Sequence, residues 1–433
     1  MATKPMSQSP RQVSEKLWHA IAGDEGAASE LLASAHIRKR KRLARLEVVR
    51  LESLHDAKRL ARVVLSDPMV ILATFAECLK KRGVKIGGRG GESYLQVAEY
   101  GLSIDLWKQS DQPAILREQM CRNGKLSWVH SLGLMDATRN KLALEIAERT
   151  VAPHPRQFIR NGGIPAFEKW LSANLDQSTA VITTDIPDCF GNIRRSLASA
   201  GLLLPEWVSK RAMFDPMDHA IALIPNAKGK LIPANTKDHI VAVSSAKRGI
   251  PKGAALSAVA SEAVLKIVLE AVEASAPGVT AASIGDNLIF LLEDASAVSP
   301  VENALTLSVA KCFGMDVIAE LTRRNSLSGT NQWFSFCGRS YREKNGELQV
   351  RTEEARIDNY MIKFEVTLGD AQTERDFERL ESSVRGWTAS HRHSSKVLME
   401  GISAAILLGE TKEHKARTTG LATETPLETI PIP

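Results

Sequence analysis

Two short segments, one around Asp185 and the other around Asp286, constrain the fold of this chain more than any other feature. Each is preceded by a run of apolar and β-branched residues that is typical of a buried strand. Gly285 and Asn287 are turn formers, so Asp286 is predicted at the tip of a hairpin. Carboxylates at the ends of two strands of one sheet could hold divalent metal between them.

The stretch between these segments predicts a turn followed by a helix. Gly249, Pro251 and Gly253 form a Gly-x-Pro-x-Gly pattern, and a helix of small residues is expected over 258–269. Small side chains would let a bound molecule lie close to the backbone. A purely structural junction between a loop and a helix would have the same pattern.

Composition sets broad limits on the chain. Its 433 residues, 44% of them apolar, can bury a sizeable core and suggest two to three domains, and the net charge of +6 suits a polyanionic partner. The five cysteines include no CxxC pair, so neither a zinc site nor a disulfide framework is indicated. No apolar run approaches the ~18 residues of a membrane span. We therefore expect a soluble, cytoplasmic protein.

Helices are expected over 14–80 and, after a strand pair at 346–352, over roughly 368–407. Within the first of these regions a basic block begins a helix that continues to Arg62. The block has no interleaved acid, which favours contact with phosphates over a solvated surface. The residues predicted to bind nucleic acid are Arg38, Lys39, Arg40, Lys41, Arg42 and Arg45.

The three central segments resemble, in order and spacing, motifs A, B and C of reverse transcriptases. Residues 185–193 resemble motif A, and 249–257 resemble the Gly-x-Pro-Gln-Gly-x-x-x-Ser of motif B. Residues 284–287, Ile-Gly-Asp-Asn, take the place of the Tyr-x-Asp-Asp of motif C. Less specific likenesses extend the resemblance to roughly 35–400. Downstream, Arg323 and Arg324 resemble motif D and 333–338 resembles motif E. Upstream, 123–125 resembles the fingers hairpin, 157–163 resembles the segment before the palm, and the basic helix resembles an N-terminal extension of the bacterial, group-II-intron and retron kind.

This resemblance implies an α+β right-hand polymerase. The implied parts are a helical basic extension over 1–80, fingers over 81–165, a palm over 166–345, a helical thumb over 346–409 and a tail over 410–433 that we expect to be disordered.

The resemblance also implies site residues. Asp185 and Asp286 would hold Mg²⁺ or Mn²⁺, with Asn287 assisting. Ile186 is expected to contact both the metal and the nucleotide. Phe190 would lie beneath the sugar and clash with a 2′-hydroxyl, so deoxynucleotides are expected as substrates. The residues expected at the nucleotide are Ile186, Phe190, Lys252, Gly253 and Lys125.

The chain departs from the family pattern at four positions. Asn287 replaces the second Asp of motif C and is a poorer metal ligand, and Ile284 replaces the Tyr that contacts the primer end. Lys252 replaces the usual Gln of motif B, and Ser127 stands where the fingers hairpin has Arg. These positions are where this chain is expected to differ from the rest of the family.

The function implied is RNA-directed DNA synthesis in bacterial antiviral defence. The partners would be an RNA template, such as a dedicated non-coding RNA, its DNA product, dNTPs, and a partner protein or a second copy of the chain. Two alternatives stay open. The same site could extend DNA without a template or from a protein primer, or the chain could be a catalytically impaired polymerase fold that binds nucleic acid within a defence complex.

Overall fold

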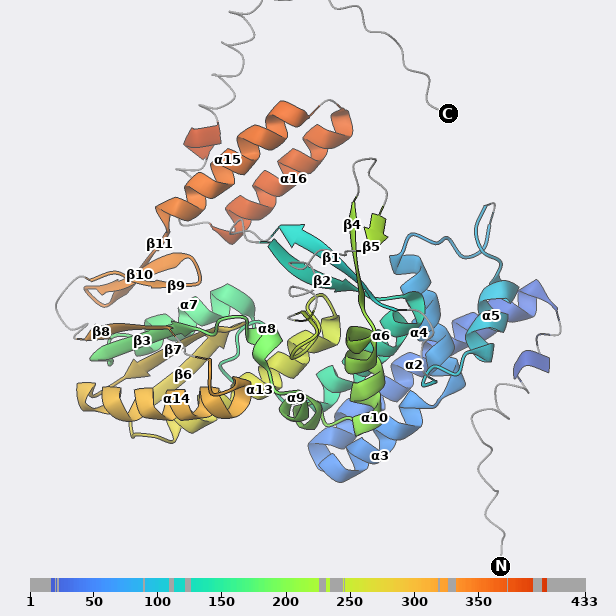
Figure 1. Cartoon of the computed structure of the whole chain (residues 1–433), viewed down its shortest axis with the longest axis horizontal. Helices are drawn as coiled ribbons and strands as arrows, with labels where there is room; N and C mark the ends of the chain where they lie inside the picture. Colours follow the sequence, from blue (N-terminus) through green and yellow to red (C-terminus); the bar gives the residue numbers. More distant parts are fainter. Residues whose placement is uncertain are drawn as a thin grey trace, which may run out of the picture. The chain divides into compact units, whose positions relative to one another are not determined.

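The computed structural model describes residues 17–402 except 20, 22, 89, 109–112, 121–125, 226–230, 234–243, 245, 318–319, 326–331, 372 and 392–398. The chain divides into two compact units, drawn in Figure 1. The first comprises Met1–Phe167 and Thr184–Thr322, and the second comprises Glu168–Thr183 and Arg323–Pro433. Helices and strands are mixed in the described residues, which agrees with the α+β class.

The first unit opens with a group of helices. They are α2 (Glu25–Glu52), α3 (Leu54–Leu65), α4 (Pro68–Lys81), α5 (Tyr94–Ser103) and α6 (Leu134–Thr150). α2 packs against each of the others, and one apolar cluster that includes Leu32, Leu72 and Phe75 is buried among them (Figure 1). Burial of this cluster, rather than helix propensity, stabilises the group.

The basic helix predicted to continue to Arg62 is interrupted, and that prediction is wrong. α2 ends at Glu52, and the extended backbone of Ser53 separates it from α3. The Ser53 hydroxyl accepts a hydrogen bond from the Asp56 N–H at 3.2 Å. A serine that can cap a new helix competes with continuation of the old one, and here the cap prevails.

A four-stranded sheet of the first unit has the order β2-β1-β4-β5. Its strands are β1 (Ile115–Met120), β2 (Leu126–Ser131), β4 (Ile221–Pro225) and β5 (Leu231–Pro233). β1 and β2 are antiparallel, which confirms the two strands expected around the fingers hairpin. The predicted hairpin tip, with Lys125, lies outside the described residues.

A second four-stranded sheet has the order β6-β7-β3-β8, and each of its strands includes residues of the first unit. The strands are β3 (Ala180–Asp185), β6 (Val279–Ile284), β7 (Asn287–Leu292) and β8 (Glu320–Asn325). β6 and β7 form an antiparallel hairpin whose last pair is Ile284 with Asn287. The strands predicted on both sides of Asp286 and before Asp185 are thus confirmed.

Helices connect these strands. They are α8 (Cys189–Asn192), α9 (Arg195–Gly201), α10 (Glu206–Ser209), α11 (Asp215–Asp218), α13 (Ala255–Glu273) and α14 (Val298–Phe313). α13 packs on α14, α6, α9 and β6. A Cβ added at Gly201 of α9 would lie 2.8 Å from the Cβ of Ala263, so the small residues of α13 allow neighbouring helices to approach closely.

The second unit contains a three-stranded sheet and a helix pair. Its elements include β9 (Phe334–Phe336), β10 (Arg339–Lys344), β11 (Glu347–Thr352), α15 (Glu354–Asp370) and α16 (Glu374–Ser390). α7 (Gly163–Asn174) begins in the first unit and ends in the second. The sheet order is β11-β10-β9, and Phe364, Leu380 and Ile402 form a small core with the helix pair.

The last helical region, predicted over 368–407, begins earlier than expected, at Glu354. Met361, Phe364 and Leu368 recur at helical spacing and pack into the small core, a pattern that the prediction missed. Among the described helices, none combines the length and apolarity needed to cross a membrane.

Candidate active site

Asp185 lies at the end of a strand, and Asp286 lies in a turn between two strands. Asp185 is the last residue of β3 and is exposed, whereas the next side chain, Ile186, is 1% exposed and anchors the chain in the core. Gly285 and Asp286 form the two-residue turn between β6 and β7. Gly285 has a φ of +63°, a conformation that glycine adopts without strain. The predicted hairpin tip at Asp286 is therefore confirmed.

The charges of three aspartates act on the thiol of Cys189. Cys189 is the first residue of α8 and is buried. Burial raises the pKa of its thiol, the negative charges of Asp286, Asp185 and Asp188 raise that pKa further, and the Lys252 ammonium lowers it. Residues from motifs A, B and C therefore lie around a single side chain.

Asp188 and Lys252 form an ion pair within this group. The Lys252 Nζ lies 2.7 Å from an Asp188 carboxylate oxygen, and it donates to the Ser127 hydroxyl at 3.5 Å. Asp188 has left-handed backbone, with φ +44°. The Asp188 carboxylate therefore has a cationic partner from the segment that resembles motif B. No local pattern around Asp188 indicates this partner, because Lys252 is distant in the chain.

Asn287 contacts Asp286 directly. Its side-chain amide donates to an Asp286 carboxylate oxygen at 3.2 Å. A neutral amide in this position orients the neighbouring carboxylate without adding charge. Asn287 is therefore a positioning residue for Asp286 in this arrangement.

The Gly-x-Pro-x-Gly turn packs against motif A. Gly249 has a φ of +64°, and a Cβ added there would lie 2.0 Å from the carbonyl oxygen of Phe190. The Ile250 N–H donates to that same oxygen at 2.9 Å. The glycine is thus required by close contact between two segments of the chain, a reason that does not involve a bound molecule.

The other end of this turn packs on strand β2. Gly253 has a φ of +91°, and an added Cβ would lie 2.4 Å from a methyl group of Val129. The His130 N–H donates to the Lys252 carbonyl at 2.8 Å. The residues that sequence analysis placed at the nucleotide, Lys252 and Gly253, are therefore held between motif A and β2.

Arg195 is a further residue of this region that sequence reasoning missed. Its guanidinium donates to the carbonyl oxygens of Gly249 at 3.1 Å and Lys247 at 2.5 Å. It also binds both carboxylate oxygens of Asp218, at 2.7 and 3.0 Å. Such forked contacts fix the start of the turn, and no local pattern around Arg195 indicates them.

His130 does not supply a charge near Lys252. Burial lowers the pKa of His130 to about 4, with the positive charges of Lys247 and Lys252 lowering it further and the Lys252 carbonyl opposing the change. The imidazole is therefore neutral at neutral pH. The positive charges that act on it are those of Lys247 and Lys252.

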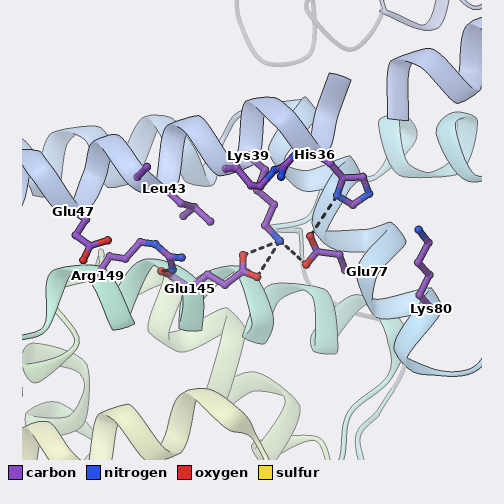
Figure 2. Close-up of a pocket in the computed structure, with 10 residues that line it drawn as sticks. His36, Lys39, Leu43, Glu47, Glu77, Lys80, Glu145 and Arg149 are labelled. Carbon is purple, nitrogen blue, oxygen red and sulfur yellow. Dashed lines mark hydrogen bonds and ion pairs between the residues drawn. The ribbon is translucent and has the colours of Figure 1, made fainter. Parts of the chain in front are cut away.

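Lys39 has a different environment from the rest of the basic block. It is 3% exposed, and its Nζ lies 2.7 Å from Glu77 and 2.8 Å from Glu145 (Figure 2). His36 Nδ1 is 3.4 Å from the Glu77 carboxylate. Lys39, predicted to contact nucleic acid, instead joins α2 to α4 and α6 beside a cavity of about 580 Å³. Burial raises the pKa of Glu77, but hydrogen bonds from His36, Lys39 and Lys141 outweigh it and lower that pKa to about 2.

Replacing Lys39 with methionine should lower the free energy of unfolding by about 2 kcal/mol, because Glu77 and Glu145 would lose a buried partner. The effect stays below the usual range for a broken buried pair since Lys141 also contacts both carboxylates, at 3.1 and 2.9 Å. Urea unfolding at neutral pH measures it. Lys41→Met, on the exposed side of the same helix, is the control and should change stability by less than about 0.5 kcal/mol.

The other predicted nucleic-acid contacts lie at the surface of α2. Arg38, Arg40, Lys41 and Arg45 are exposed, and Arg42 is half-buried. Their role in binding stays a prediction.

The carboxylates of Asp185 and Asp286 supply oxygen ligands of the kind that Mg²⁺ prefers. Among the described residues, no three His, Cys, Asp or Glu side chains are grouped so as to hold a metal ion. Mg²⁺, however, is usually bound by one or two carboxylates together with water and substrate phosphates. The carboxylates of Asp185, at the end of β3, and Asp286, in the turn between β6 and β7, fit that mode.

Comparisons with known proteins give a faint structural likeness. No family model and no curated protein matches the chain. The solved structures that it resembles include telomerase from Candida albicans in complex with a fragment of telomeric RNA, at 10% identity and a TM-score of 0.37, covering 67% of this chain and 57% of that one. Another is apo telomerase from Candida tropicalis, at 12% identity and a TM-score of 0.35, covering 56% of each chain. The chain thus spans a little over half of these structures, and TM-scores this low establish no shared fold.

Proposed function

We propose that this chain is a nucleotidyltransferase of the reverse-transcriptase kind, which polymerises deoxynucleotides on an RNA template. The observation that carries the proposal is that β3, which ends at Asp185, lies beside the β6–β7 hairpin whose turn holds Asp286, and that Lys252 lies 2.7 Å from Asp188, three residues after Asp185. These residues come from the three segments whose order and spacing resemble motifs A, B and C. A role in bacterial antiviral defence is part of the proposal and is supported by the sequence resemblance alone.

In this proposal Asp185 and Asp286 hold Mg²⁺, or Mn²⁺ in its place. The metal would favour deprotonation of the primer hydroxyl and neutralise the triphosphate charge. Asn287 fixes the orientation of the Asp286 carboxylate through its 3.2 Å hydrogen bond. Lys252, 39% exposed in its side chain, can exchange Asp188 for a phosphate of the incoming nucleotide.

In this proposal Phe190 makes the enzyme prefer deoxynucleotides to ribonucleotides. The carbonyl oxygen of Phe190 accepts the Ile250 N–H, which joins this part of motif A to the turn of motif B. Phe190 is half-buried. A ring beneath the sugar excludes a 2′-hydroxyl by steric contact and offers it no acceptor.

Phe190→Ala should therefore reduce discrimination between dNTPs and NTPs by at least roughly tenfold, the scale of one lost steric contact. Primer extension with each class of triphosphate measures the ratio of kcat/KM values. Phe158→Ala, which changes a buried phenylalanine outside motif A, is the matched control and should leave the ratio unchanged. An unaltered ratio in Phe190→Ala would remove the assignment of Phe190 as the sugar gate.

The activity itself is tested with protein purified from its host. Sequencing of the co-purifying nucleic acid, followed by incubation with labelled dNTPs on that RNA, should show template-dependent incorporation. Incorporation that persists after RNase treatment would favour synthesis without an RNA template. A protein that binds nucleic acid and incorporates nothing would favour the impaired-subunit alternative.

A further inference from the structure

A groove on the surface of α2 is lined almost entirely by basic side chains. Its volume is about 410 Å³, and its lining residues are Ser34, Ile37, Arg38, Lys41, Arg42 and Arg45. These positions are separated by three or four residues, so they share one face of the helix. Lys39 and Arg40 line a different cavity, so the block of like charges is divided between two sides of α2.

Asp67 holds two of these arginines in place. It is 5% exposed, precedes Pro68 at the start of α4, and accepts the Met69 N–H on one carboxylate oxygen at 3.1 Å. The other oxygen accepts Arg38 Nε at 2.7 Å and lies 3.6 Å from Arg42 Nε. A single buried carboxylate therefore orients two guanidinium groups that lie one helical turn, about 6 Å, apart.

The atoms used in these contacts determine what the arginines can bind. Both approach Asp67 through Nε, and a guanidinium has two further nitrogens that can bind phosphate oxygens in parallel. Side chains that are fixed beforehand lose less conformational entropy when a ligand binds. Arg38 retains 47% exposure of its side chain, so this ordering does not remove it from solvent.

The face suits a nucleic-acid backbone better than a lipid surface. A helix that lies on a membrane needs a broad exposed apolar face, whereas Leu32, Leu43 and Leu46 of α2 are buried in the protein and its large exposed apolar side chains are Ile37, Val48 and Leu51. Ile37 is the one large apolar side chain among the lining residues. Cations spaced by a helical turn match successive phosphates of a polynucleotide.

We propose that this groove binds the phosphodiester backbone of RNA, with Arg38 and Arg42 contacting phosphates and Asp67 acting as their positioning residue. That the bound polymer is RNA rests on the proposed function, whereas the binding of phosphates by Arg38 and Arg42 does not.

The decisive variant is Asp67→Asn. Asparagine can keep the helix cap with its amide oxygen while its NH₂ group faces Arg38 Nε, so the arginines lose their anchor. If net charge alone governed binding, removing an acid would strengthen the affinity for RNA. The proposal predicts the opposite, a loss of roughly tenfold in affinity for a short double-stranded RNA, with the salt dependence unchanged because the number of phosphate contacts is the same. Equal or tighter binding by Asp67→Asn would overturn the proposal.

Arg38→Gln/Arg42→Gln measures the phosphate contacts themselves. It should weaken RNA binding and lower the slope of log K against log salt by about 1.5, the share of two lost contacts. Lys58→Gln/Arg59→Gln removes the same charge from exposed positions of α3 outside the groove and serves as the matched control. Equal effects of the two double variants would mean that the groove has no special role.

Competition with lipid distinguishes RNA from a membrane surface as the source of the phosphates. Vesicles of acidic phospholipid should compete poorly with RNA, and preferential binding to them would identify a membrane surface instead. RNA binding that depends on Asp67 in a chain that incorporates no nucleotide would overturn the polymerase proposal and leave the groove proposal standing, so the two failures are distinguishable. Urea unfolding of Asp67→Asn checks that its effect on binding arises in a folded protein.

Discussion

Asp286→Asn should lower the rate of nucleotide incorporation at least about a hundredfold, equivalent to about 2.7 kcal/mol of lost transition-state stabilisation. The substitution changes little in size, and Asp286 lies in a two-residue turn that asparagine also tolerates. What it removes is one of two carboxylates available to bind metal. Single-turnover primer extension at saturating dNTP and Mg²⁺ measures the effect on the chemical step.

Asp188→Asn is the matched control for this experiment. Asp188 also acts on the Cys189 thiol, but its carboxylate is engaged by Lys252 at 2.7 Å. Incorporation should fall by less than roughly tenfold, and mainly through a change in KM, because Lys252 would lose its partner while the metal ligands stay. If the two variants lost activity equally, the distinction between the Asp185–Asp286 pair and Asp188 would be wrong.

Gly249→Ala should destabilise the first unit by about 3 kcal/mol. Left-handed backbone costs an alanine about 1–2 kcal/mol, and the added Cβ would force apart two segments now joined by the Ile250–Phe190 hydrogen bond. Displacement of the turn would also move Lys252. Chemical unfolding gives the stability, and primer extension below the unfolding transition gives the accompanying loss of activity.

Gly83→Ala separates the cost of left-handed backbone from the cost of the contact between the added Cβ and Phe190. Gly83 has a φ of +81°, but an added Cβ there would meet no atom within 4 Å. Its expected cost is the backbone term alone, about 1 kcal/mol. A Gly249→Ala variant no less stable than Gly83→Ala would show that the contact with Phe190 relaxes freely.

Local patterns predicted much of this fold. The apolar runs at β3, β6 and β7 and the turn residues around Asp286 identified strands and a hairpin tip, because alternation, strand length and turn chemistry are set by neighbouring residues. The helix at α13 was predicted for the same reason. The break at Ser53 was missed because the serine caps a new helix there. The early helix start at Glu354 was missed because packing into the small core stabilises the helix before 368.

The sequence by itself determined which carboxylates stand at strand ends, and motif spacing indicated that Asp185 and Asp286 act together. Only the tertiary structure decided how the charges around them are paired. Asp188 and Lys252 are far apart in the chain yet lie 2.7 Å apart, and Lys39 is buried between Glu77 and Glu145 although its neighbours are exposed. Electrostatic partners are set by distance in space, and a run of charges in sequence carries no information about which of them the fold will bury.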